Sequence, residues 1–290
     1  MSATDFEAIA AMVYRQVKRW ATSKSRVLSV IIQPLLWLAF LGIGFGSIFS
    51  PNNLNILPGD NTTTTLISPA ALRAALSRYF TSIFGGIDYM TFIVTGMAAV
   101  VAFIGSFISG ISVIWDKQFG FLKETLVAPA SRKFVIFGRM LGDSIVNTLQ
   151  SLIILLLALL ISTRVSILGI PIALAYIFLT SLGFTGLGIA MSLKFSSMEG
   201  FQMIINLLTM PLMFMSGAFF PIGTMPTWMK VVALANPLTY AIYGVRYWLT
   251  GAAEGFSFIN PVTSTVALAV FTLISTVVAM MVFEGASIED

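Results

Sequence analysis

Long apolar runs without charged residues dominate this chain, and short charged segments separate them. Because a membrane-spanning helix needs about 20 mostly apolar residues, each run is long enough to hold one. The pattern therefore predicts an all-α, multi-pass membrane protein with six spanning helices. The charge-free runs cover residues 27–59, 89–115, 144–163, 165–193, 200–229 and 255–283. We place the spans at about 28–49, 91–115, 136–161, 170–193, 200–219 and 262–283.

Composition supports this prediction and excludes several kinds of chemistry. The chain is 57% hydrophobic and only 10% charged, whereas a soluble domain is about 25% charged. It contains no Cys and no His. Disulfides, thiolate nucleophiles, Cys/His zinc sites and a Ser-His-Asp triad are therefore excluded.

The distribution of Lys and Arg predicts the orientation of the spans. Eleven of the sixteen basic residues lie before the first span, between the second and third, or between the fourth and fifth. Cytoplasmic loops carry the excess of positive charge. We therefore expect both termini and the segment after the second span to be cytoplasmic, and the protein to reside in the cell (plasma) membrane.

Residues 1–26 form a separate N-terminal element ahead of the membrane domain, which we assign to residues 27–290. Within it, Asp5–Lys24 has the pattern of an amphipathic helix, with basic residues on the polar side. Basic residues together with a Trp suit a helix that lies among lipid headgroups. A solvated helix is the alternative. The predicted apolar face consists of Phe6, Ile9, Ala10, Val13, Val17 and Trp20.

The segment between the second and third spans is charged but carries an apolar face. Residues 116–139 read DKQFGFLKETLVAPASRKFVIFGR, in which Phe121, Leu122, Leu126 and Val127 follow roughly helical spacing and Pro129 ends the helix. A loop that only reversed the chain would not need an apolar face. We therefore predict that residues 116–134 form a short helix at the cytoplasmic surface that docks into another protein.

The segment between the fifth and sixth spans, residues 220–255, is apolar but broken. Pro221, Pro226 and Pro237 interrupt it, and its longest charge-free stretch, residues 231–245, is too short to span. We predict two short helices that enter the outer leaflet partway and return. Non-helical backbone at that depth must be buried in protein or line a wet cavity, so the segment is either a structural cap or part of a pathway.

Polar and soft side chains within the spans supply candidate pathway residues. Asp143, Asn147 and Gln150 share one face of the third span. This face lines either a pathway or a dimer seam, or else Asp143 lies at headgroup level and pairs with Arg139. On the fifth span, flexible side chains that adapt to varied ligands predict substrate contact. The candidate pathway residues are Asn147, Gln150, Met203, Met210, Met213 and Phe214.

Two segments together, FGFLKETLVAPASR and SGAFFPIGTMPTWMKVVALANPLTYAIYGVR, resemble the permease subunits of ABC type-2 exporters, especially the daunorubicin-resistance (multidrug) type. The resemblance implies a second permease copy, identical or different, and separate ATP-binding subunits that hold ATP and Mg. It assigns ATPase coupling to the insert that begins at Asp116, through Lys117, Gly120, Phe121, Lys123, Glu124, Leu126, Pro129 and Arg132. It assigns an outer re-entrant hairpin to Pro221, Asn236, Pro237 and Tyr240.

The residues themselves agree that any ATPase must be a partner. A phosphate-binding P-loop needs Gly-x-x-x-x-Gly-Lys-Ser/Thr, but the only Lys followed by Ser or Thr is Lys24, without the required glycines. We therefore expect no enzyme activity, no cofactor bound by this chain and no nucleic-acid partner. The predicted function is a permease subunit that exports a hydrophobic or amphipathic drug or lipid.

Three other functions compete with this prediction. A lipid-linked glycan exporter shares the same plan of spans. A secondary transporter or channel would work without an ATPase, but it commonly shows internal repeats and a buried ion pair at mid-membrane. A polytopic enzyme is disfavoured because the acidic residues are scattered and His is absent.

Overall fold

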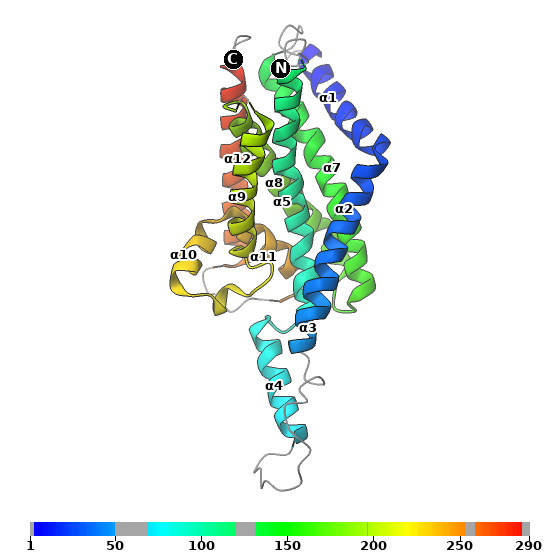
Figure 1. The fold of residues 1–290 in the computed structure, drawn as a ribbon, viewed down its shortest axis with the longest axis vertical. Helices are drawn as coiled ribbons and strands as arrows, with labels where there is room; N and C mark the ends of the chain where they lie inside the picture. Colours follow the sequence, from blue (N-terminus) through cyan, green and yellow to red (C-terminus); the bar gives the residue numbers. More distant parts are fainter. Residues whose placement is uncertain (1–2, 50–68, 120–130, 196, 253–258, 286–290) are drawn as a thin grey trace.

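The structure is a computed structural model that describes residues 3–49, 69–119, 131–195, 197–252 and 259–285. All regular elements in these residues are helical. Figure 1 shows an elongated bundle, with α4 (Pro69–Ile83) extending beyond one end. The start of α1 and the end of α12 lie at the opposite end, close to the end of α5 and the start of α7.

Four helices are long and apolar enough to cross a membrane. They are α5 (Tyr89–Gln118), α7 (Arg132–Ile161), α8 (Ile170–Ser192, preceded by the 3₁₀ turn Ile167–Gly169) and α12 (Pro261–Glu284). Side-chain caps fix two of the starts. The Asp88 carboxylate accepts from the Thr91 amide at 3.0 Å, and Asn260 forms a reciprocal capping box with Thr263.

Shorter apolar helices occupy the ranges predicted for the first and fifth spans. The first is continuous but irregular: α2 (Lys24–Trp37) leads through a π-helical segment, η1 (Leu38–Ile43), into α3 (Gly44–Phe49). The other, α9 (Met198–Phe214), ends five residues before the predicted boundary at residue 219. The chain turns there, and Gly217 has a φ of 82° that favours glycine. The count of six spans and the orientation remain predictions.

Helix α1 (Ala3–Thr22) lies along α7 rather than apart from the bundle. Its backbone approaches closely because α7 presents glycines. A Cβ at Gly138 would lie 2.7 Å from the Ile9 Cα, and one at Gly142 would lie 3.0 Å from the Val13 Cα. Part of the predicted apolar face therefore lies against the bundle. Ile9 and Val13 pack on α7, but Phe6 is 66% exposed.

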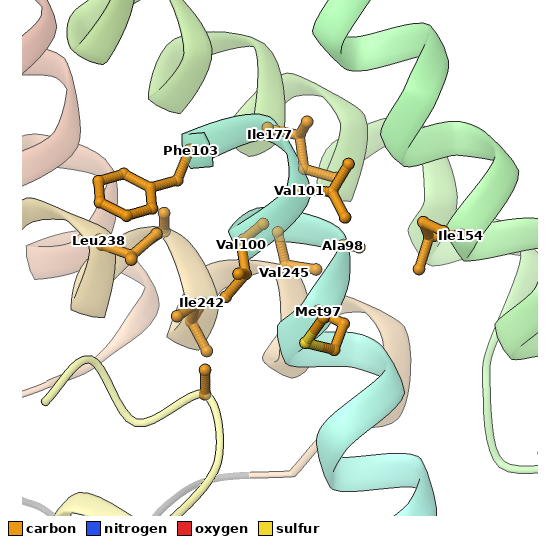
Figure 2. Close-up of a cluster of buried hydrophobic side chains, with 14 of the residues drawn as sticks. Met97, Ala98, Val100, Val101, Phe103, Ile154, Ile177, Leu238, Ile242 and Val245 are labelled. Carbon is orange, nitrogen blue, oxygen red and sulfur yellow. The ribbon is translucent and has the colours of Figure 1, made fainter. Parts of the chain in front are cut away.

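The core forms around α5, whose residues 91–103 are all buried. Figure 2 shows α5 side chains such as Met97 and Val100 gathered with Ile154 of α7, Ile177 of α8 and Ile242 of α11. Each large apolar side chain buried in this way contributes about 1.5–3 kcal/mol relative to water. The surrounding helices therefore hold α5 in place over most of its length.

The segment after α9 contains two short helices, α10 (Thr227–Ala235) and α11 (Pro237–Thr250), after the 3₁₀ turn η4 (Ile222–Thr224). Asn236 separates them. Its side chain accepts from the Leu238 amide at 3.0 Å and donates to the Leu212 carbonyl at 2.7 Å. The asparagine therefore caps α11 and ties it to the end of α9. Helix α11 is mostly buried against α5, α8 and α12.

Candidate functional site

A cavity of about 570 Å³ lies between the N-terminal helices α1 and α2 on one side and α5 and α7 on the other. This volume lies within the range typical of small-molecule sites, about 300–1,000 Å³. Met213 of α9 completes the wall. The lining residues that the argument below uses are Gln16, Arg19, Gln33, Trp37, Met97, Val100, Ser112, Asp143, Asn147, Gln150 and Met213.

The two ends of the cavity differ in polarity. Along α5 the wall runs from Met97 to Ser112, a rise of about 22 Å at 1.5 Å per residue. Arg19 and Asp143 lie towards the Ser112 end. Trp37 and Met213 join Met97 at the other end, where Val100 and Val101 add apolar surface and Gln33 and Gln150 add two amides. The space is therefore suited to an amphipathic molecule.

The polar face predicted on α7 does line this cavity. Asp143, Asn147 and Gln150 all contribute to its wall. The Asn147 amide is fixed, because its Nδ2 donates to Ser181 Oγ at 2.9 Å and to Ser106 Oγ at 3.3 Å. A Cβ at position 105 would lie 2.5 Å from Asn147 Oδ1, so Gly105 provides the space for this amide.

An ion-pair network joins three helices near the polar end. Asp116 of α5 accepts from Arg139 of α7 at 2.5 Å and lies 3.5 Å from Arg15 of α1. Arg139 also donates to Ser112 Oγ at 2.7 Å. Burial lowers the pKa of Arg15, and the neighbouring Asp116 partly offsets that shift. The predicted pairing of Arg139 with Asp143 is therefore wrong. Spacing along α7 suggested this pair, but Arg139 forms its ion pair with the Asp116 carboxylate of α5.

The network also changes the interpretation of Asp116. The sequence placed it at the start of the ATPase-coupling insert, but the side chain is only 7% exposed and points to α1 and α7. Lys117 lies in the last turn of α5 beside it, and Arg132 begins α7. The other predicted coupling residues lie outside the described residues: Gly120, Phe121, Lys123, Glu124, Leu126 and Pro129.

The four candidates on α9 do not gather at one place. Met213 is buried and lines the cavity, whereas Phe214 packs on Phe219 with ring centroids 5.0 Å apart. Met203 is 74% exposed and Met210 57% exposed, so both lie on the outer surface of this subunit. Helical spacing of the methionines did not reveal that α9 has two different environments.

The predicted outer residues organise the α10–α11 hairpin. Pro221 is buried before η4, Pro237 starts α11, and the Tyr240 hydroxyl donates to the Leu234 carbonyl at 2.7 Å. With the Asn236 cap, these contacts account for the hairpin shape.

Arg246 is one of the five basic residues that the charge distribution assigns to the outer side, but it is only 1% exposed in the structure. Its Nη2 donates to the carbonyls of Phe92 and Gly217, both at 3.1 Å. Its guanidinium also lies 3.6 Å from the centroid of the Phe92 ring. Arg246 thus fastens α11 to α5, and its isolation in an otherwise apolar stretch was the signal available in the sequence.

The fold and cavity define the class as a helical, multi-pass membrane protein. Among the described residues, no group of three or more His, Cys, Asp or Glu could hold a metal ion. A family model for the ABC-2 type transporter matches residues 7–250, and the chain therefore belongs to this family. Its members are membrane subunits of ABC transporters, are not themselves catalytic, and typically work with an ATP-binding cassette subunit.

Individual relatives agree with the family. The chain is 27% identical over 259 residues to ycf38 of Cyanophora paradoxa, named as a transport permease, covering 86% of this chain and 79% of the relative. It is 26% identical over 157 residues to YbhR of Escherichia coli (strain K12), which is named as a probable multidrug ABC transporter permease. The match covers 53% of this chain and 42% of YbhR. It is 27% identical over 186 residues to the daunorubicin resistance ABC transporter permease DrrB1 of Streptomyces coeruleorubidus. The match covers 60% of this chain and 64% of DrrB1.

Proposed function

We propose that this chain is the permease subunit of an ATP-driven exporter in the cell membrane. It moves a hydrophobic or amphipathic drug or lipid out of the cytoplasm or the inner leaflet. The observation that carries this proposal is the long cavity with one polar and one apolar end. The names of YbhR and DrrB1, which refer to multidrug and daunorubicin transport, support the same substrate class.

ATP and Mg bind to a separate ATPase subunit that docks on the insert 116–134. The helices that flank this insert, α5 and α7, are also two walls of the cavity. A rigid helix carries a displacement at one end along its length. Closure of an ATPase dimer against the insert would therefore change the cavity directly, without a relay through other elements.

A second permease copy, identical or different, completes the transporter, and membrane lipids surround it. The route outward follows the seam between the two copies, lined by the first, second and fifth spans and capped by residues 220–255. Exposed apolar side chains on two of these spans support the seam: Phe40 is 72% exposed on η1, and Met203 is 74% exposed on α9.

The first test is co-purification with the ATP-binding subunit, followed by ATP-dependent export from proteoliposomes. Gly120→Pro should leave the permease inserted in the membrane but abolish coupling, because proline breaks a docking helix. Normal ATP-driven export by Gly120→Pro would show that the docking assignment is wrong. Export by the permease without any ATPase would favour a secondary transporter instead.

The second test concerns the seam. Trp at Met210 or at Phe214 should alter export or substrate-stimulated ATP hydrolysis. The matched control is Val266→Trp on α12, whose side chain is 56% exposed on a helix outside the proposed seam. If both α9 variants export the same substrates at the same rate as the control, α9 does not line the route.

A further inference from the structure

The polar end of the cavity presents hydrogen-bond donors that the described chain does not use. Arg19 lines the cavity, and its guanidinium makes no hydrogen bond or ion pair there. One turn earlier on α1, Gln16 also lines the cavity and is only 5% exposed. Its Nε2 donor has no acceptor. Because buried donors are normally paired, the unpaired Gln16 amide beside the half-buried Arg19 guanidinium indicates a ligand rich in acceptor oxygens.

The charge balance at this end favours an anion over a cation. Three guanidinium groups, of Arg15, Arg19 and Arg139, stand against two carboxylates, of Asp116 and Asp143, although Asp143 Oδ2 has no hydrogen-bond partner among the described residues. Asp116 is shared by Arg15 and Arg139, and Asp143 makes an interaction of its own within the chain. Arg19 is the cavity-lining cation left without a partner among the described residues. Its planar fork of donors matches a phosphate or carboxylate.

The opposite end of the cavity suits an apolar tail. Trp37, Met97, Val100 and Met213 form much of its wall. This wall is deep in the subunit, since Met97 and Met213 are 2% and 4% exposed and Val100 is fully buried. A ligand that reaches from Arg19 to Met97 must therefore carry its charge at one end and hydrocarbon at the other.

We propose that this cavity within a single subunit binds an anionic amphiphile, with the acidic headgroup on Arg19 and Gln16 and the tail along α5. The inference rests on the proposed function only in taking this ligand to be the exported molecule. The lining residues come from α1, α2, α5, α7 and α9 of one chain, so a single subunit supplies all the contacts of this site. It selects the charge of the cargo before the cargo reaches the seam.

The test uses Trp37 as a reporter in the purified full-length chain. Trp20, Trp115, Trp228 and Trp248 are changed to Phe, so that quenching reports on Trp37 alone. Lysophosphatidic acid with a brominated acyl chain is titrated against lysophosphatidylcholine with the same chain. The anionic lipid should quench saturably, at a concentration about tenfold lower than the choline lipid, because a charge-assisted hydrogen bond adds roughly that factor.

Variants on α1 separate a specific site from general charge attraction. Arg19→Gln should weaken anionic-lipid binding about tenfold, and Arg19→Lys should retain much of it. Lys18→Gln is the matched control. It removes the same charge from the adjacent position, where the ammonium lies 5.4 Å from the Tyr14 ring centroid and outside the cavity. If an aromatic sulfonate displaces the brominated lipid, the ligands of this site include anionic drug-like molecules. If it does not, the ligands are restricted to anionic lipids.

Three outcomes would overturn the site: no saturable quenching, equal quenching by both lipids, or an equal effect of Arg19→Gln and Lys18→Gln. Should the variant with a single Trp not fold, the unaltered chain gives a second readout. Lysophosphatidic acid should raise its melting temperature, and Arg19→Gln should remove that rise. If the purified chain binds lysophosphatidic acid at this site but its complex with the ATPase exports no substrate, the proposed function is wrong and the proposed binding site is still supported.

Discussion

The replacement Asp116→Asn tests how strongly α1, α5 and α7 are held together. The Asp116 carboxylate serves Arg139, whose side chain is 4% exposed, and Arg15, whose side chain is 30% exposed. The replacement leaves the Arg139 charge buried without a counter-charge at position 116, with a neutral amide oxygen and the Ser112 hydroxyl as its acceptors. Removing one partner of a buried pair costs about 3–5 kcal/mol. Most of this cost falls on Arg139, because water screens the more exposed Arg15.

The matched control breaks an ion pair on the surface of the same part of the bundle. Lys133 lies 2.8 Å from Glu284, but their side chains are 43% and 53% exposed. Lys133→Gln should therefore cost no more than about 1 kcal/mol. In thermal unfolding of the purified permease, Asp116→Asn should lower the midpoint by roughly 10 °C, and the control by only a few degrees.

A double replacement separates the free-energy cost of burying an unpaired charge from the cost of losing the ion pair itself. Asp116→Leu combined with Arg139→Met removes both charges and refills the space with apolar groups. Such exchanges are often neutral or stabilising, so the double variant should regain most of the stability. If Asp116→Asn and Lys133→Gln unfold at the same temperature, the network does not hold α1, α5 and α7 together.

Two further predictions concern the packing of α11. Arg246→Met should lower the free energy of unfolding by about 2–4 kcal/mol, because it removes charged hydrogen bonds and a cation–π contact. The matched control is Arg164→Met, at an exposed arginine that donates to one carbonyl. It should lower the free energy of unfolding by less than about 1 kcal/mol. Equal losses at both positions would contradict the fastening role. Gly169→Ala should impair folding, because its Cβ would collide with the carbonyl of Trp248, whereas a Cβ at Gly223 meets nothing within 4 Å. Folded yield by size-exclusion chromatography compares the two glycine variants, and equal yields would show that the approach at Gly169 is not tight.

The hydrophobic runs were sufficient to locate the long helices. α5, α8 and α12 begin and end within three residues of the predicted spans, because apolar length and capping residues such as Asp88 are local features of the chain. The two short helices of the outer segment were predicted for the same reason, since Asn236-Pro237 must interrupt a helix.

Contacts between distant parts of the chain could not be predicted in this way. Spacing within the third span suggested that Asp143 pairs with Arg139, but Asp116 lies 23 positions away in the sequence and takes that arginine. Periodicity on the fifth span grouped Met203 with Met213, but the packed neighbours of α9 separate them. The cavity itself depends on how α1 and α2 approach α5, which no local pattern specifies.

The walls of the cavity differ in how easily they can move. α5 is surrounded by core side chains, so its displacement would disturb the packing of α8 and α11 as well. The opposite wall is formed by α2, whose outer side is exposed at Leu36 (64%), and the η1 segment that continues it is exposed at Phe40 (72%). Helix α2 also contains Pro34, which lacks an amide donor and lies four residues before the π-helical segment η1 begins at Leu38. These features weaken the helix where it borders the cavity. A change in cavity volume during transport should therefore arise mainly from bending of α2 and η1 against a fixed α5, and the seam to a second permease would form on the wall that moves.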